Sequence, residues 1–248
     1  MKIFRTTLLT LLTVLLLGAL FSAAAAPGVS VTLGGEDAAG MADSVQLLLL
    51  FTVIALVPSI LIMMTGFTRI VIVLSFLRNA LGLQQTPPNQ VLAGLALFLT
   101  LFLMSPVLTE INETAYEPYV EGVITQDEAL SAAAKPMREF MLAQTRSEDL
   151  NMFLELAGQE KPESFDEIKT TTIIPAFVTS ELRRAFIIGF LIYLPFLIID
   201  MVVASILMSM GMVMLPPVMI SLPFKVMLFV VVDGWGLLIR SLILSFNL

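Results

Sequence analysis

The sequence predicts an all-α protein of the integral-membrane type, with two long Pro-bent helical hairpins and an acidic, extracytoplasmic helical segment inserted between them. Hydrophobic residues make up 58% of the 248 residues and charged residues only 13%, whereas about 25% of a soluble domain is charged. Uncharged runs approach or exceed the roughly 20 residues that a helix needs to cross a bilayer. Each hairpin has one plan: an apolar run, a Pro-Pro pair and a second apolar run.

The N-terminal residues 1–26 have the three parts of a cleavable signal peptide. Lys2 and Arg5 supply the charged start, an apolar core follows, and small residues form the cleavage zone. A retained anchor helix is the alternative, but the apolar core is shorter than a membrane span requires. Residues 27–44 follow as a Gly- and Asp-containing linker.

The first predicted hairpin covers residues 45–109. Pro58 interrupts its first apolar run and predicts a kink, because proline removes a helical hydrogen bond and its ring clashes with the preceding turn. Pro87 and Pro88 form the bend. Arg69 lies within the apolar region, so we expect it to be a buried or interfacial charge.

Residues 110–182 form the acidic segment, with fifteen acidic against five basic residues. Ser147 can cap a helix that ends before Gly158, and Ser164 with Glu167 matches a capping box. The loop of the first hairpin carries basic residues and no acidic one. The positive-inside rule therefore places that loop in the cytoplasm and the acidic segment in the periplasm.

The second predicted hairpin covers residues 183–248. Its proline bends are predicted at Pro195, Pro216 and Pro217. Asp200 and Lys225 are the sharpest functional candidates, because an ionised group in a membrane segment is costly unless it is paired or hydrated.

The position of the turn decides which charges of this hairpin meet. A turn about residues 212–213 puts Asp200 opposite Lys225, whereas a turn centred on the Pro-Pro pair puts Asp200 near Asp233. A structural salt bridge and an ion or proton relay both fit these residues.

Methionines alternate with other residues just before the second Pro-Pro pair: Met208, Met210, Met212 and Met214. A period of two does not form one stripe on a helix, so the stretch near Gly211 is predicted to be a loop or an extended turn. Methionine is a common filler of irregular cores. The alternative is a pore constriction, which a ring of flexible thioethers would seal.

The absence of Cys and His excludes disulfides, thiolate chemistry and the usual zinc sites. Two membrane aspartates raise an aspartyl intramembrane protease, but Lys225 lies between them in the chain and the Gly-x-Gly-Asp pattern is absent. No phosphate-binding loop is present. We therefore predict no enzyme, cofactor or metal site, and the net charge of −7 gives no reason to expect nucleic-acid binding.

A resemblance to a known family rests on three segments: residues 63–92 (MMTGFTRIVIVLSFLRNALGLQQTPPNQVL), 175–190 (PAFVTSELRRAFIIGF) and 222–235 (LPFKVMLFVVVDGW). They closely resemble the FliP family of flagellar type III export-gate proteins. The equivalent gate subunit of virulence injectisomes looks similar too. The signal peptide and the long exported loop favour the flagellar branch.

The resemblance implies a pentamer that joins FliQ and FliR in the bacterial inner membrane, at the flagellar basal body. Unfolded flagellar proteins would pass through its channel, and the family's methionine-rich constriction would fall on residues 208–214. The assembly of this family sits largely above the membrane plane, so protein as well as lipid would cover the hairpins. The rival functions are a proton-coupled small-solute transporter that uses Asp200, and a scaffold that lines no channel.

Overall fold

The computed structural model describes residues 47–48, 51–52, 55–56, 58–159, 164–212 and 214–246. The predicted signal peptide and linker lie outside these residues. The chain divides into two units, residues 1–55 and 56–248, and the description below concerns the second unit.

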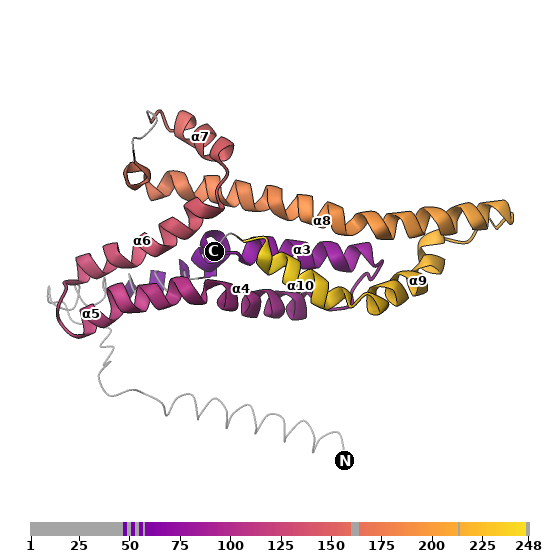
Figure 1. Cartoon of the computed structure of the whole chain (residues 1–248), viewed down its shortest axis with the longest axis horizontal. Coiled ribbons are helices and arrows are strands. Elements are labelled where there is room, and N and C mark those ends of the chain that lie inside the picture. The colour runs from indigo at the N-terminus through magenta and orange to yellow at the C-terminus, as the bar shows by residue number, and fades with distance from the viewer. Residues whose placement is uncertain are drawn as a thin grey trace, which may run out of the picture. The chain divides into compact units, whose positions relative to one another are not determined.

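Every regular element among the described residues of this unit is helical, which confirms the predicted all-α class. The elements are α3 (Phe67–Ala80), α4 (Asn89–Ile111), the π-helix η1 (Asn112–Tyr116), α5 (Glu117–Val120), α6 (Gln126–Gln144), α7 (Ser147–Leu156), the 3₁₀ turn η2 (Phe165–Glu167), α8 (Thr170–Ser209), α9 (Pro217–Val231) and α10 (Gly234–Leu244). Figure 1 shows α8 as the longest element, with α3 beside it and α9 returning from its far end.

By length and composition, the described residues contain two helices that could cross a membrane, or up to four spans if each bent pair counts as one. The helical stretches Asn89–Val120 and Thr170–Ser209 are each long and apolar enough to cross a bilayer. Two further pairs of helices meet this criterion only if each bent pair counts as one span: Pro58–Met64 with Phe67–Ala80, bent by 78°, and Pro217–Val231 with Gly234–Leu244, bent by 67°.

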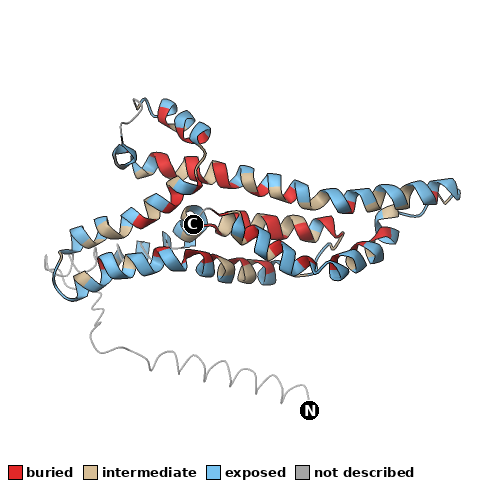
Figure 2. Cartoon of the chain, in the orientation of Figure 1, coloured by how far each residue is buried: buried red, intermediate tan, exposed pale blue. Residues whose placement is uncertain are grey.

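The core lies where α3 packs against α8 and α4. Buried side chains on α3 follow the i, i+3, i+4, i+7 pattern: Ile70, Val73, Leu74 and Leu77. Ile173 and Phe177 of α8 are equally buried in the same cluster. Burying a large apolar side chain stabilises by about 1.5–3 kcal/mol, so this one stripe fixes α3 in place. Figure 2 shows that the buried residues gather here.

α7 packs against α8 through a polar contact as well as apolar ones. The hydroxyl of Ser180, fully buried on α8, donates to Asp149 Oδ2 at 2.7 Å and accepts from the Arg146 amide at 3.0 Å. The helix predicted at Ser147 is present as α7, with Gly158 in the left-handed conformation after its end. Ser147 does not cap it, however: Ser147 is its first residue, and the N-cap is Arg146, whose side chain makes no capping hydrogen bond. The predicted capping box at residues 164–167 falls instead on the short turn η2.

Both Pro-Pro pairs lie at connections between helices, as predicted, whereas Pro195 does not break its helix. α8 continues unbroken through Pro195, because losing one hydrogen bond leaves long apolar turns intact on both sides. Pro87 and Pro88 lie in the connection between α3 and α4, while Pro216 and Pro217 open α9. Pro58 is the first residue of the described helix Pro58–Met64, and position 57 before it lies outside the described residues. The predicted bend at Pro58 therefore also lies outside them.

The two sharp bends fall next to Gly66 and at Asp233. Gly66 precedes α3, and a Cβ there would lie 2.6 Å from Leu103 Cδ2. Asp233 has φ 51°, the left-handed region, and separates α9 from α10. A non-glycine residue in that region is strained by about 1–2 kcal/mol, so the packing around α10 holds it there.

The predicted limits of the acidic segment fall inside helices. α4 runs to Ile111 and passes directly into η1, and α8 begins at Thr170, twelve residues before position 182 (182 − 170 = 12). The charge composition of a segment shows where the chain becomes more polar, but it does not show where a helix ends. Helices end at caps, glycines and turns, and the chain has none of these at residues 110 and 182.

Candidate functional site

The methionine-rich stretch forms the turn between α8 and α9. Met210 is the C-cap of α8, and Gly211 follows with φ 75°. The Gly211 amide donates to the Met208 carbonyl and the Met212 amide to the Leu207 carbonyl, both at 3.0 Å. This pair of bonds is a Schellman motif, which ends a helix with a left-handed residue. Only glycine adopts that conformation without a steric penalty.

Three of the four methionines of this turn are exposed among the described residues. Met214 is 99% exposed, Met208 and Met210 are also exposed, and Met212 is half-buried. A flexible apolar side chain has no stabilising contact in such a position. No described residue covers the three exposed methionines, so the turn is an uncovered apolar surface in the described part of the chain.

Asp200 and Lys225 meet across the α8–α9 hairpin. Lys225 Nζ lies 2.6 Å from Asp200 Oδ2 and 3.1 Å from the carbonyl oxygen of Ala80. The hydroxyl of Ser221 donates to the other carboxylate oxygen of Asp200. The structure thus pairs Asp200 with Lys225, while Asp233 lies at the start of α10.

This ion pair sets the register of the hairpin. Lys225 is 1% exposed, so an unpaired ammonium at this position would be strongly unfavourable. Removing one partner of a buried ion pair typically costs about 3–5 kcal/mol. Because Lys225 also reaches the end of α3 at Ala80, the pair fixes the base of the hairpin relative to the core.

A second buried charge cluster surrounds Arg69. Its guanidinium bonds both carboxylate oxygens of Glu181 on α8, with Nε 2.8 Å from Oε2. It also donates to the Ser245 carbonyl at 2.9 Å and to Gln144 Oε1 at 3.3 Å, and it stacks 3.6 Å from the ring centroid of Phe246. One fully buried side chain therefore joins α3, α6, α8 and the end of α10.

Glu181 and Gln144 are the residues of this cluster that sequence reasoning missed. Glu181 falls within the predicted acidic segment, yet its side chain is fully buried. A signal was present in the sequence: Phe177, Glu181 and Ala185 are spaced by four residues, and all three are buried on one side of α8. Their spacing places Glu181 on the core face.

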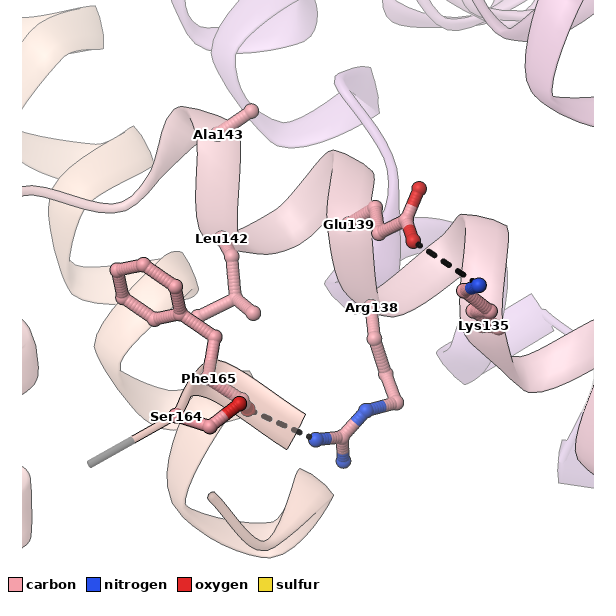
Figure 3. Close-up of a pocket in the computed structure, with 7 residues that line it drawn as sticks. All are labelled: Lys135, Arg138, Glu139, Leu142, Ala143, Ser164 and Phe165. Carbon is pink, nitrogen blue, oxygen red and sulfur yellow. Dashed lines mark hydrogen bonds and ion pairs between the residues drawn. The ribbon is translucent and has the colours of Figure 1, made fainter. Parts of the chain in front are cut away.

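A pocket of about 500 Å³ lies beside the start of α8, and Figure 3 shows its lining. Arg138 of α6 extends along it and donates to the carbonyl of Ile168 at 2.7 Å, the carbonyl of Phe165 at 3.3 Å and the hydroxyl of Thr170 at 2.6 Å. These bonds tie α6 to η2 and to the first turn of α8. Arg138 therefore acts as a structural connection.

Metal-binding clusters are absent from the described part of the chain, where no three acidic side chains are grouped to hold an ion. The chemically distinctive features are the exposed methionine turn, the Asp200–Lys225 ion pair that holds its hairpin and the fully buried Arg69–Glu181 pair in the core.

Comparison with known proteins gives consistent matches. The FliP family profile matches residues 50–242. The flagellar biosynthetic protein FliP of Bacillus subtilis (strain 168) is 59% identical over 211 residues, which cover 85% of this chain and 96% of that protein. The protein of the same name from Aquifex aeolicus (strain VF5) is 48% identical over 238 residues, covering 95% and 98% of the two chains. The resemblance expected from three segments is confirmed, and the chain belongs to the FliP family.

Proposed function

We propose that this protein is a subunit of the flagellar type III export gate in the bacterial inner membrane, at the flagellar basal body. In this proposal copies of the chain, as a pentamer, assemble with FliQ and FliR around a channel for unfolded flagellar proteins. The observation that carries the proposal is the exposed methionine turn at residues 208–214, on a hairpin that the ion pair of buried Lys225 with half-buried Asp200 braces. Similar proteins named for flagellar biosynthesis support the flagellar branch.

The chemistry of methionine suits a constriction that must seal and open. A thioether is apolar and flexible, so it fills irregular gaps and adapts to different neighbours. A ring of such side chains excludes hydrated ions, as apolar constrictions in channels do by dewetting. The same ring yields to a passing polypeptide without binding it strongly, because thioether sulfur is only a weak hydrogen-bond acceptor.

The exposed apolar surface of the hairpin supports assembly into a ring. The outer part of α8 and most of α9 expose large apolar side chains, and Figure 2 shows this end of the hairpin as mostly exposed. A groove of about 440 Å³ between Ile198 and Phe224 has only apolar lining. A soluble monomer rarely exposes so large an apolar surface, so neighbouring subunits and lipids are the proposed cover. Residues 110–182 are proposed to lie in the periplasm.

The pairing of Asp200 argues for a structural role in this gate. A proton carrier needs a carboxylate that is free to bind and release protons during the cycle. Here both oxygens of Asp200 have partners, Lys225 on one side and Ser221 on the other. This arrangement supports a fixed salt bridge over the proton-coupled transporter.

Ion leakage through assembled gates tests the proposed constriction. Replacing Met210, Met212 and Met214 by Ala removes the bulk of the ring while leaving Gly211 and the Schellman bonds in place. We expect the complex to assemble and to conduct ions without a substrate. The matched control replaces Met201, an exposed methionine on α8 nine residues before Met210, by Ala. Gates with this substitution should not conduct ions. Tight gates carrying the triple substitution would refute the constriction.

A further inference from the structure

The end of the hairpin formed by α4 and α6 has a helix face that no described residue covers. Figure 1 shows α5 at this end, where η1 and α5 continue α4 before the chain turns back into α6. Four large apolar residues follow the i, i+3, i+4, i+7 pattern there: Tyr116, Tyr119, Val120 and Val123. They are between 46% and 71% exposed. Tyr116 ends η1, Tyr119 and Val120 lie in α5, and Val123 follows the turn at Gly122, so this apolar stripe runs over the helix end and its turn.

The turn that ends α5 presents this stripe in a defined geometry. Gly122 has φ 73°, its amide donates to the Tyr119 carbonyl at 3.1 Å, and the Val123 amide donates to the Pro118 carbonyl at 2.9 Å. This is again a Schellman motif. The capping box that follows, in which Thr125 and Glu128 bond each other's backbone amides, starts α6 directly afterwards. The apolar stripe is therefore carried by a closed, hydrogen-bonded turn.

Acidic residues surround the stripe without a basic one. Residues 110–134 contain six acidic side chains and no basic side chain, and all six are exposed: Glu110, Glu113, Glu117, Glu121, Asp127 and Glu128. Glu117 and Glu121 lie between the apolar residues in the chain, and Glu113 precedes them. An apolar centre with a charged rim is the general plan of a protein interface.

From this juxtaposition we propose that a tip face of the chain docks onto another protein whose apolar patch is rimmed by Lys and Arg. The tip face is formed by Tyr116, Tyr119, Val120 and Val123. The negative charge of the acidic rim selects a basic partner, because complementary charge favours association and like charge opposes it. An anionic lipid surface is repelled by six carboxylates. The same face of a second copy is repelled for the same reason. The tip face is separate from the methionine turn, so the two proposals stand independently.

Photocrosslinking from the full chain in flagellated cells tests this inference. A photoreactive amino acid replaces Tyr119 in one strain and Ser131, an exposed control residue on α6, in another. We expect the position-119 probe to form an adduct with one protein, at a segment rich in Lys and Arg, and the position-131 probe not to form it. Glu113→Lys with Glu121→Lys should lower the yield about tenfold, and exchanging the partner's basic residues for Glu should restore it.

Several results would overturn the proposal. Adducts from position 119 that contain only lipid, the N-terminal residues of the same chain, or a second copy would assign the tip face to a different cover. Absence of any adduct would show that the face is free. A yield that does not change on charge reversal, with the melting temperature of the variant unchanged, would remove the acidic rim from recognition.

Discussion

Replacing Glu181 by Gln is expected to destabilise the protein strongly, because the guanidinium of Arg69 then remains buried without its carboxylate. Both side chains are 0% exposed. Removing one partner of such a pair costs about 3–5 kcal/mol, which is a large share of the roughly 5–15 kcal/mol that stabilises a typical domain. At about 2–4 °C per kcal/mol for a chain of this size, the melting temperature should fall by roughly 6–20 °C.

The assay is thermal unfolding of the full chain in detergent or lipid nanodiscs, with Glu155→Gln as the matched control. Glu155 is an exposed residue on α7, so the same chemical change there should alter stability by less than about 0.5 kcal/mol. The double substitution Arg69→Met with Glu181→Leu removes both charges and should destabilise less than Glu181→Gln alone. Equal stability of Glu181→Gln and the wild type would refute the burial of this pair.

Three further predictions follow from the turn, the hairpin and the acidic segment. Asp200→Asn should destabilise the hairpin by about 3–5 kcal/mol and reduce gate assembly in native gels, whereas normal stability with lost proton coupling would favour a transporter. Gly211→Ala should cost roughly 1–2 kcal/mol in thermal unfolding because of its left-handed backbone, while Gly94→Ala, in open space within α4, should be neutral or stabilising. The amide of Thr125, with a smaller effect of its hydroxyl, holds the pKa of Glu128 below its usual range. The stabilisation is therefore present above the unfolded-state pKa and is lost as the pH falls through the lowered folded-state pKa; an NMR titration showing an ordinary pKa would contradict it.

Patterns that repeat locally in the chain were predictable from sequence. Apolar runs and the near absence of charge identified the all-helical membrane class, and Ser147 with Gly158 marked α7 within a residue or two. Gly211 located the turn after α8. Each of these features depends on neighbours within one or two helical turns, which the sequence displays directly.

Features that depend on distant residues were not predictable in the same way. The partner of Arg69 is 112 positions away, and nothing local to Arg69 selects Glu181 over the other acidic residues. The bend at Gly66 lies against residues distant in the chain, because a Cβ there would be 2.6 Å from Leu103 Cδ2 and 2.9 Å from the Phe246 ring. The capping box at Thr125 and Glu128, by contrast, is a local feature that the T-x-x-E pattern indicates directly.

Site-specific photocrosslinking from the methionine turn tests the central proposal most directly. A photoreactive residue is placed at Met210 or Met214 in cells whose export substrate is stalled in transit, with Met201 on the same helix as the control position. A channel wall predicts adducts with the stalled substrate from the turn and none from the control. Adducts only with neighbouring subunits would make the turn a packing surface and would favour a scaffold that lines no channel.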